Sequence, residues 1–192
     1  MNQRKLIGAG TALLLGLALT AGLAGCATSG ISISRVKLYN SVSELAQDSD
    51  VIVVGTAHDN WVTADLPVNP DLDFTLSDFV VEQVVRSDIP ITVNDTIVVR
   101  QVGAENGSHI QVGNKKPVTA ALVPILQTGQ RYLLYLNHSG LDGDLASQYY
   151  ITGVSAGMYV GVSAKDPTHF KHITPDEGDV LPASLHIDQA LG

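Results

Sequence analysis

Apolar positions along the chain fall into short, β-branched runs rather than into long helical stripes. The first run spans residues 50–57 (DVIVVGTA), and others cover 95–102 (DTIVVRQV) and 131–137 (RYLLYLN). Val, Ile and Tyr in such runs favour strands, because their side chains pack well on a pleated surface. Residues 148–164 (QYYITGVSAGMYVGVSA) predict two more strands on either side of a Gly-containing turn at 153–157. The chain is therefore expected to be rich in β-strands.

Two segments require a choice between helix and strand. Residues 74–87 (FTLSDFVVEQVVRS) carry apolar positions that could share one helical face, but the segment contains four valines, whose β-branching favours a strand. Residues 40–50 (NSVSELAQDSD) instead predict a short helix. Ser41 and Glu44 have the spacing of a capping box, in which each residue caps an N–H group of the first helical turn.

Polar, turn-forming segments separate these elements. We expect loops at 58–73 (HDNWVTADLPVNPDLD), at 104–117 (a loop or a hairpin) and at 141–147, and a last strand or helical turn within 175–192. Five or six short strands with one early helix predict a mainly β protein, either a small antiparallel barrel or a sandwich. The order of a short helix followed by a closed meander resembles an OB-fold-like barrel.

The N-terminal segment has a different pattern from the rest of the chain. Arg4 and Lys5 precede an uncharged run, rich in Leu, Ala and Gly, that continues to Cys26. A basic start, an apolar stretch and small residues at its end are typical of a secretory signal peptide. The alternative is a retained membrane span of nearly the ~20 residues required. Gly8, Gly10, Gly16 and Gly22 disfavour that alternative, because each lowers helix stability by about 1 kcal/mol.

Cys26, the only cysteine, stands where the apolar run ends. The four residues Leu23-Ala24-Gly25-Cys26 resemble the lipobox of bacterial lipoproteins. This resemblance implies that the Cys26 thiol receives a diacylglycerol and that the chain is cleaved before it. A buried thiol or a catalytic cysteine is the other possibility, but the surrounding residues supply neither a core pattern nor a neighbouring base. We therefore expect a lipid anchor in a membrane, on the outer face of the cytoplasmic membrane or in the outer membrane.

These features divide the chain into four parts. We expect a removed signal peptide at 1–25, a tether at 26–36, a β-domain at 37–174 and a C-terminal tail at 175–192. The strand pattern from Ser41 to Ser163 resembles an uncharacterised β-domain of exported bacterial proteins, a resemblance that implies no activity.

Charge limits the partners of the predicted domain. Without Arg4 and Lys5, the chain keeps nine of its 11 basic residues against 19 acidic ones, a balance of −10. Such a surface repels nucleic acid, so we expect no nucleic-acid partner. An envelope protein or a glycan is the expected partner. Trp61, Tyr149, Tyr150 and Tyr159 are the aromatic residues that a glycan could use, although packing would explain them equally well.

Metal ligands are suggested by two patterns, neither of them complete. His169 and His172 form an HxxH pair followed by Asp176 and Glu177, but a zinc site requires three or four ligands. The remaining candidates are single histidines at loop edges and acidic loops without a full calcium-binding pattern. They are His58, His109 and His138, then Asp65, Asn69, Asp71 and Asp73, and finally Asp142 and Asp144. We expect no metal and no cofactor.

Ser155 lies in GVSAG, which matches the G-x-S-x-G pattern of serine hydrolases. That pattern has a catalytic meaning only between a strand and a helix, whereas a strand is predicted to follow Ser155. We therefore expect a non-catalytic binding or structural module without catalytic residues. The alternative is a small envelope hydrolase or metal-dependent enzyme that uses Ser155 or the His169/His172 region.

Overall fold

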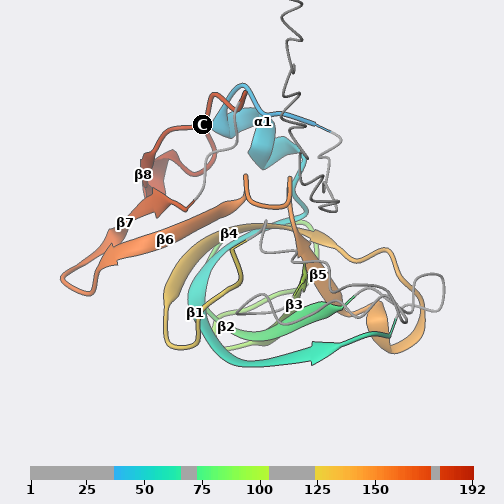
Figure 1. Cartoon of the computed structure of the whole chain (residues 1–192). Coiled ribbons are helices and arrows are strands. Elements are labelled where there is room, and N and C mark those ends of the chain that lie inside the picture. Colours follow the sequence, from blue (N-terminus) through green and yellow to red (C-terminus); the bar gives the residue numbers. More distant parts are fainter. Residues whose placement is uncertain (1–36, 66–72, 104–123, 174–177) are drawn as a thin grey trace, which may run out of the picture.

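The computed structural model describes residues 37–65, 73–103, 124–173 and 178–192, which form a mainly β protein (Figure 1). In this part of the chain a short helix, α1, precedes eight strands; one single-turn 3₁₀ helix lies between β4 and β5, and another follows β8. The elements are α1 (Val42–Gln47), β1 (Val51–Thr63), β2 (Phe74–Ser87), β3 (Thr96–Val102), β4 (Arg131–His138), η2 (Gly143–Leu145), β5 (Gln148–Ile151), β6 (Met158–Ser163), β7 (Asp166–His172), β8 (Ser184–His186) and η3 (Ile187–Gln189).

The first five strands close into a barrel. Their order is β1-β2-β3-β5-β4, and β4 pairs with β1 to complete the ring. The prediction of a small barrel with one short helix is thus confirmed, and a closed five-stranded barrel is the architecture that OB-folds use. One junction differs from the expected antiparallel pattern, because β3 and β5 run parallel, with Val98 beside Gln148.

Strands β1 and β4 are buried on both faces, which explains their uninterrupted apolar runs. Along β1, Val51 and Val53 point into the barrel, whereas Ile52 and Val54 point outward into a second core. Along β4, Leu134 likewise packs inside the barrel while its neighbours pack outside. The barrel wall between the two cores is therefore apolar throughout.

The second core is covered by α1 and the C-terminal part of the chain (Figure 1). Helix α1 begins as predicted, because the Ser41 side chain accepts a hydrogen bond from the Glu44 N–H at 3.1 Å. Strands β6, β7 and β8 extend the sheet beyond β4 and lie on the same side as α1. Leu185 and Ile187 bury their side chains in this core, so residues from the predicted tail pack with the barrel.

Two stretches differ from the sequence prediction, and a third realises the alternatives that the prediction left open. Strand β1 continues to Thr63 through the first part of the predicted loop at 58–73, because the backbone keeps pairing with β2 although the side chains become polar. Strand β7 was not predicted, because Pro167 and the polar residues on both sides of the buried Phe170 do not form a recognisable strand pattern. The final segment forms both of the alternatives predicted for it, a strand (β8) and a helical turn (η3).

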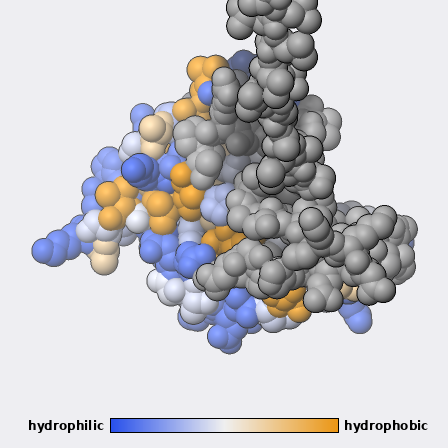
Figure 2. All heavy atoms as spheres, in the orientation of Figure 1, coloured by the Kyte–Doolittle hydropathy of each residue, from blue (hydrophilic) through white to orange (hydrophobic). Residues whose placement is uncertain are grey.

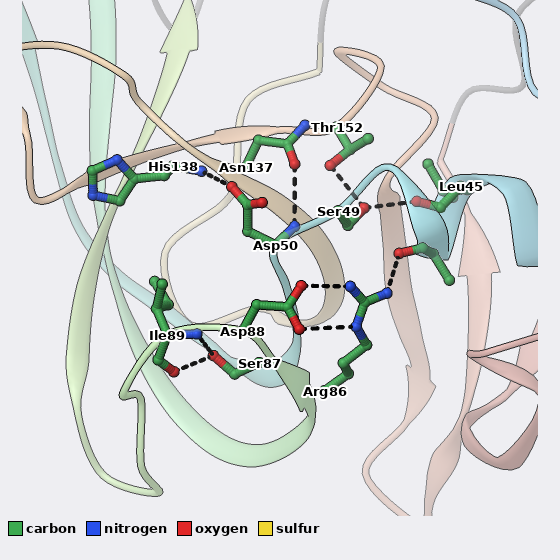
Figure 3. Close-up of polar contacts among 11 residues, drawn as sticks. Leu45, Ser49, Asp50, Arg86, Ser87, Asp88, Ile89, Asn137, His138 and Thr152 are labelled. Atoms are coloured by element: carbon green, nitrogen blue, oxygen red, sulfur yellow. Dashed lines mark hydrogen bonds and ion pairs between the residues drawn. The ribbon is translucent and has the colours of Figure 1, made fainter.

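Hydrogen bonds join α1 to one end of the barrel (Figure 3). Ser49 donates to the Thr152 hydroxyl at 2.9 Å. Next to it, the Asp50 N–H donates to the Asn137 side chain at 3.2 Å, and the Asp50 carboxylate accepts from the His138 N–H at 2.9 Å. These bonds hold the start of β1 against β4 and so fix the register at which the barrel closes.

Arg86 makes a second link at the same end (Figure 3). Its guanidinium donates to the carbonyl oxygen of Ala46 at 2.7 Å and forms an ion pair with Asp88 at 2.6 Å. The end of β2 is thereby tied to the last turn of α1. Because the guanidinium and the Asp88 carboxylate satisfy each other here, we assign this cluster a structural role.

Gly55 tests how tightly the barrel wall is packed. A methyl group at Gly55 would lie 2.6 Å from a ring carbon of Phe79 and closer still to the backbone oxygen of Val80. We expect Gly55→Ala to lower the free energy of unfolding by about 3 kcal/mol, measured by chemical denaturation, because overpacking displaces the backbone. The control is Gly161→Ala, whose added carbon would meet its nearest atom at 3.4 Å. Equal stability of the two variants would contradict this account.

Candidate functional site

A row of large side chains crosses the outer surface of the barrel. The strand register places Trp61 on β1 beside Leu76 on β2, Leu76 beside Arg100 on β3, and Arg100 beside Tyr150 on β5. The neighbours of Arg100 along β3, such as Val99, point into the barrel interior. Since side chains alternate along a strand, the row lies on the outer face. We call it the outer row.

Arg100 is the most unusual member of the outer row, because its side chain is completely buried. One of its nitrogens, Nη2, contacts both carboxylate oxygens of Asp65, at 2.6 and 2.7 Å. Its Nε donates to the Gln148 side chain at 2.6 Å, and the guanidinium carbon lies 4.5 Å from the centre of the Phe74 ring. A buried charge requires such partners, because the desolvation free energy of an isolated ion is large and unfavourable.

One nitrogen of this guanidinium has no partner among the described residues. Nη1 of Arg100 is buried and makes no hydrogen bond with any residue that the structure describes. Buried polar atoms are nearly always satisfied, by protein or by bound water. The two N–H groups of Nη1 therefore mark a position where an acceptor oxygen would be stabilised.

Trp61 and Tyr150, at the two ends of the outer row, reach solvent, whereas Leu76 is buried like Arg100. The Trp61 side chain is 41 % exposed, which is rare for so large an apolar group. Tyr150 is half-buried, and burial raises the pKa of its phenol, so it is a neutral donor and acceptor at physiological pH. The charges of Arg100 and Asp65 balance. The outer row thus combines an exposed aromatic ring with hydrogen-bonding groups and no net charge.

The two other aromatic candidates belong to the interior. Tyr149 packs inside the barrel and Tyr159 packs in the second core between Tyr135 and His172. Burial raises the pKa of Tyr159 and of Tyr135 well above the usual value. Of the four aromatic residues that were candidates for contact with a glycan, only Trp61 and Tyr150 reach the surface.

The HxxH pair is not brought together. His169 and His172 lie on β7, where residues three apart point to opposite faces of the sheet. His172 is buried with its Nε2 3.0 Å from the Ala156 oxygen, whereas His169 is exposed. Asp176 and Glu177 lie outside the described residues.

The acidic loops are only partly described. Asp65 is the partner of Arg100, and Asn69 and Asp71 lie outside the described residues, as does His109. Asp73 lies at the start of β2, where its backbone oxygen accepts from the Gly103 N–H. Asp142 and Asp144 flank the start of η2. In the described part of the chain, no three His, Cys, Asp or Glu side chains are grouped so as to hold a metal ion.

Ser155 and the remaining histidines occupy structural positions. Ser155 is buried in the turn between β5 and β6, and strand β6 follows it, where a nucleophile elbow has a helix. His138 stacks edge-on against Tyr149 at a centroid distance of 5.8 Å. His58 is exposed on β1, where its backbone oxygen accepts a hydrogen bond from Thr128.

Cys26 and the tether lie outside the described residues. Within the described residues, no helix has both the length and the apolar character needed to cross a membrane. Comparison of the chain with protein-family models, with curated proteins and with solved structures finds no match. The outer row is therefore assigned from geometry alone.

The role of Arg100 was not predicted from the sequence. An arginine at an outward strand position normally indicates a solvated side chain, and its carboxylate partner lies 35 residues away in a loop. The one available signal for a buried arginine was its position: Arg100 is the only charged residue of the strand TIVVRQV.

Asp65 tests the ion pair. Because Asp65→Ala leaves the Arg100 guanidinium buried without its carboxylate, we expect the free energy of unfolding to fall by about 2 kcal/mol, a value reduced for the partial exposure of Asp65. The double variant Asp65→Ala/Arg100→Met removes both charges and should be more stable than Asp65→Ala alone.

Urea denaturation of the three proteins measures this difference, with Asp88→Ala as the control for an exposed ion pair. The control should lose less than about 1 kcal/mol. If the double variant is no more stable than Asp65→Ala alone, the buried charge is not the cause.

Proposed function

We propose that this protein is a lipid-anchored binding module of the bacterial cell envelope, without catalytic activity. The anchor is the diacylglycerol on Cys26. Its support is the order of basic start, apolar run and Leu23-Ala24-Gly25-Cys26 at the N-terminus. Two acyl chains, at about 0.8 kcal/mol per buried CH₂ group, hold a protein stably in a bilayer, whereas one chain holds it only marginally.

A binding role, rather than a catalytic one, is favoured by where the candidate reactive groups lie. Ser155 is buried in a turn that a strand follows, and His169 and His172 face opposite sides of β7. By contrast, Trp61 in the outer row is exposed and positioned by the barrel. Small rigid barrels commonly bind extended ligands on such a sheet face.

The ligand that best fits the outer row is an uncharged envelope glycan. The observation that carries this proposal is the placement of exposed Trp61 and half-buried Tyr150 in one row across the sheet. Three strand spacings separate the two residues, a span of about 14 Å, which a short oligosaccharide can bridge. One ring would stack on Trp61, and a hydroxyl or acetamido oxygen further along the ligand would hydrogen-bond to Tyr150, because Arg100 itself is shielded from solvent. The acidic chain and the balanced Arg100–Asp65 pair disfavour an anionic ligand.

Cys26 tests the anchor. We expect Cys26→Ala to abolish incorporation of radiolabelled palmitate and to move the protein from the membrane fraction to the soluble fraction. A matched control, Ser29→Ala, changes a nearby tether residue and should leave both properties unaltered. Unchanged labelling and fractionation of Cys26→Ala would overturn the anchor proposal.

Trp61 tests the glycan site, because it is the only tryptophan and its fluorescence reports on this position alone. We expect chitotetraose to change Trp61 emission in a saturable manner, and insoluble chitin, an uncharged polymer of the same sugar, to co-sediment the protein. Trp61→Ala should reduce the co-sedimented fraction at least tenfold, since stacking on an aromatic ring contributes much of the affinity for a sugar.

Val93→Ala is the matched control, as Val93 is exposed and lies outside the outer row. An acidic polymer such as poly(dT) should not bind. Co-sedimentation that is equal for Trp61→Ala and for the intact chain would contradict a glycan site at the outer row.

A further inference from the structure

Strands β7 and β8 place two histidines directly opposite each other, away from the outer row (Figure 1). His169 on β7 is the register partner of His186, the last residue of β8. The centres of their rings are 4.8 Å apart and their planes are nearly perpendicular, at 76°. Both side chains reach solvent, with exposures of 46 % for His169 and 32 % for His186.

In both rings the Nδ1 atom is already engaged. His169 Nδ1 lies 2.7 Å from a carboxylate oxygen of Asp166. His186 Nδ1 accepts from the Asp188 N–H at 3.3 Å, and the carboxylate of Asp188 lies 3.2 Å from it. The Nε2 atoms of both rings have no hydrogen-bond partner among the residues that the structure describes. The nitrogens left for a ligand are therefore the two Nε2 atoms.

A carboxylate on Nδ1 is the usual companion of a histidine that binds a metal through Nε2. It fixes the tautomer and the ring orientation and raises the basicity of the ligating nitrogen. Asp166 already has this position on His169, and it also accepts a hydrogen bond from the Thr168 hydroxyl at 2.8 Å. For His186, metal binding at Nε2 would move the ring proton to Nδ1, where the Asp188 carboxylate can accept it.

The ring spacing also fits a shared metal ion. With a metal–nitrogen distance of about 2.1 Å, two imidazoles on one ion have ring centres about 5 Å apart. The observed 4.8 Å is close to that value. The backbone pairing of β7 with β8 holds the two rings at this distance before any ion arrives, so little ordering is required on binding.

We propose that His169 and His186 form a surface site for one divalent transition metal ion, bound through the two Nε2 atoms. Imidazole ligands suit Cu²⁺, Ni²⁺ and Zn²⁺ and do not suit Mg²⁺ or Ca²⁺. With two protein ligands the remaining coordination positions are open to water, so the affinity is modest and the ion exchanges with the surroundings. The site is independent of the anchor and of the glycan-binding proposal.

The test is isothermal titration of the full chain in detergent with Cu²⁺, Zn²⁺ and Mg²⁺ at pH 7.5. All proteins carry Cys26→Ser, so that this thiol cannot bind the metal. We expect one Cu²⁺ per chain with a Kd in the micromolar range, weaker Zn²⁺ binding and no heat from Mg²⁺. His169→Ala and His186→Ala should each weaken Cu²⁺ binding at least tenfold, whereas the control His58→Ala, another exposed strand histidine, should not.

Two further measurements distinguish metal binding by the two histidines from a purely structural contact between their rings. Asp166→Asn should weaken Cu²⁺ binding about tenfold or more while leaving the unfolding temperature of the metal-free protein nearly unchanged. In the protein with both histidines intact, substoichiometric Cu²⁺ should broaden the ring NMR signals of His169 and His186 before those of His58 and His138. Broadening that begins at another histidine, or Cu²⁺ binding that survives loss of both His169 and His186, would overturn the proposal.

Discussion

The pairing of β1 with β4 is the interaction on which the rest of the structure depends. It closes the barrel, and both strands are apolar on both faces, so it also forms the wall between two cores. Burial of apolar surface on both sides is the dominant stabilising contribution, at about 25 cal/mol per Å². The hydrogen bonds of Asp50 to Asn137 and His138 fix the register of this pairing (Figure 3). A slip by one residue would exchange the contents of the two cores.

This arrangement also decides which surfaces are available for binding. The outer faces of β4 and of the first part of β1 are occupied by α1, β6 and the C-terminal elements. The outer row lies elsewhere, running from Trp61 near the end of β1 across β2 and β3 to β5. Figure 2 shows one face of the molecule, where hydrophilic and hydrophobic side chains alternate over small areas. Binding specificity on such a surface depends on a few well-positioned groups rather than on a broad apolar patch.

The fold class could be predicted from the sequence because the strands have strong local signals. The run VIVV of β1 and the run YLLYL of β4 indicate burial on both faces, and Ser41 with Glu44 marks the start of α1. What local patterns do not contain is the pairing between distant elements. The parallel β3–β5 junction and strand β7 depend on contacts across the sheet, and polar residues alternate along β7 so that Phe170 alone marks its buried side.

The candidate sites were harder to predict for the same reason. Spacing in sequence implies proximity only once the secondary structure is known. On a helix, His169 and His172 would share a side, whereas on β7 they face opposite ways and His169 meets His186 instead, 17 residues along the chain. Arg100 likewise contacts a residue distant in sequence, Asp65, in the loop that follows β1. In a β protein the groups that act together belong to neighbouring strands, so the register, rather than the motif, determines which chemistry the surface can perform.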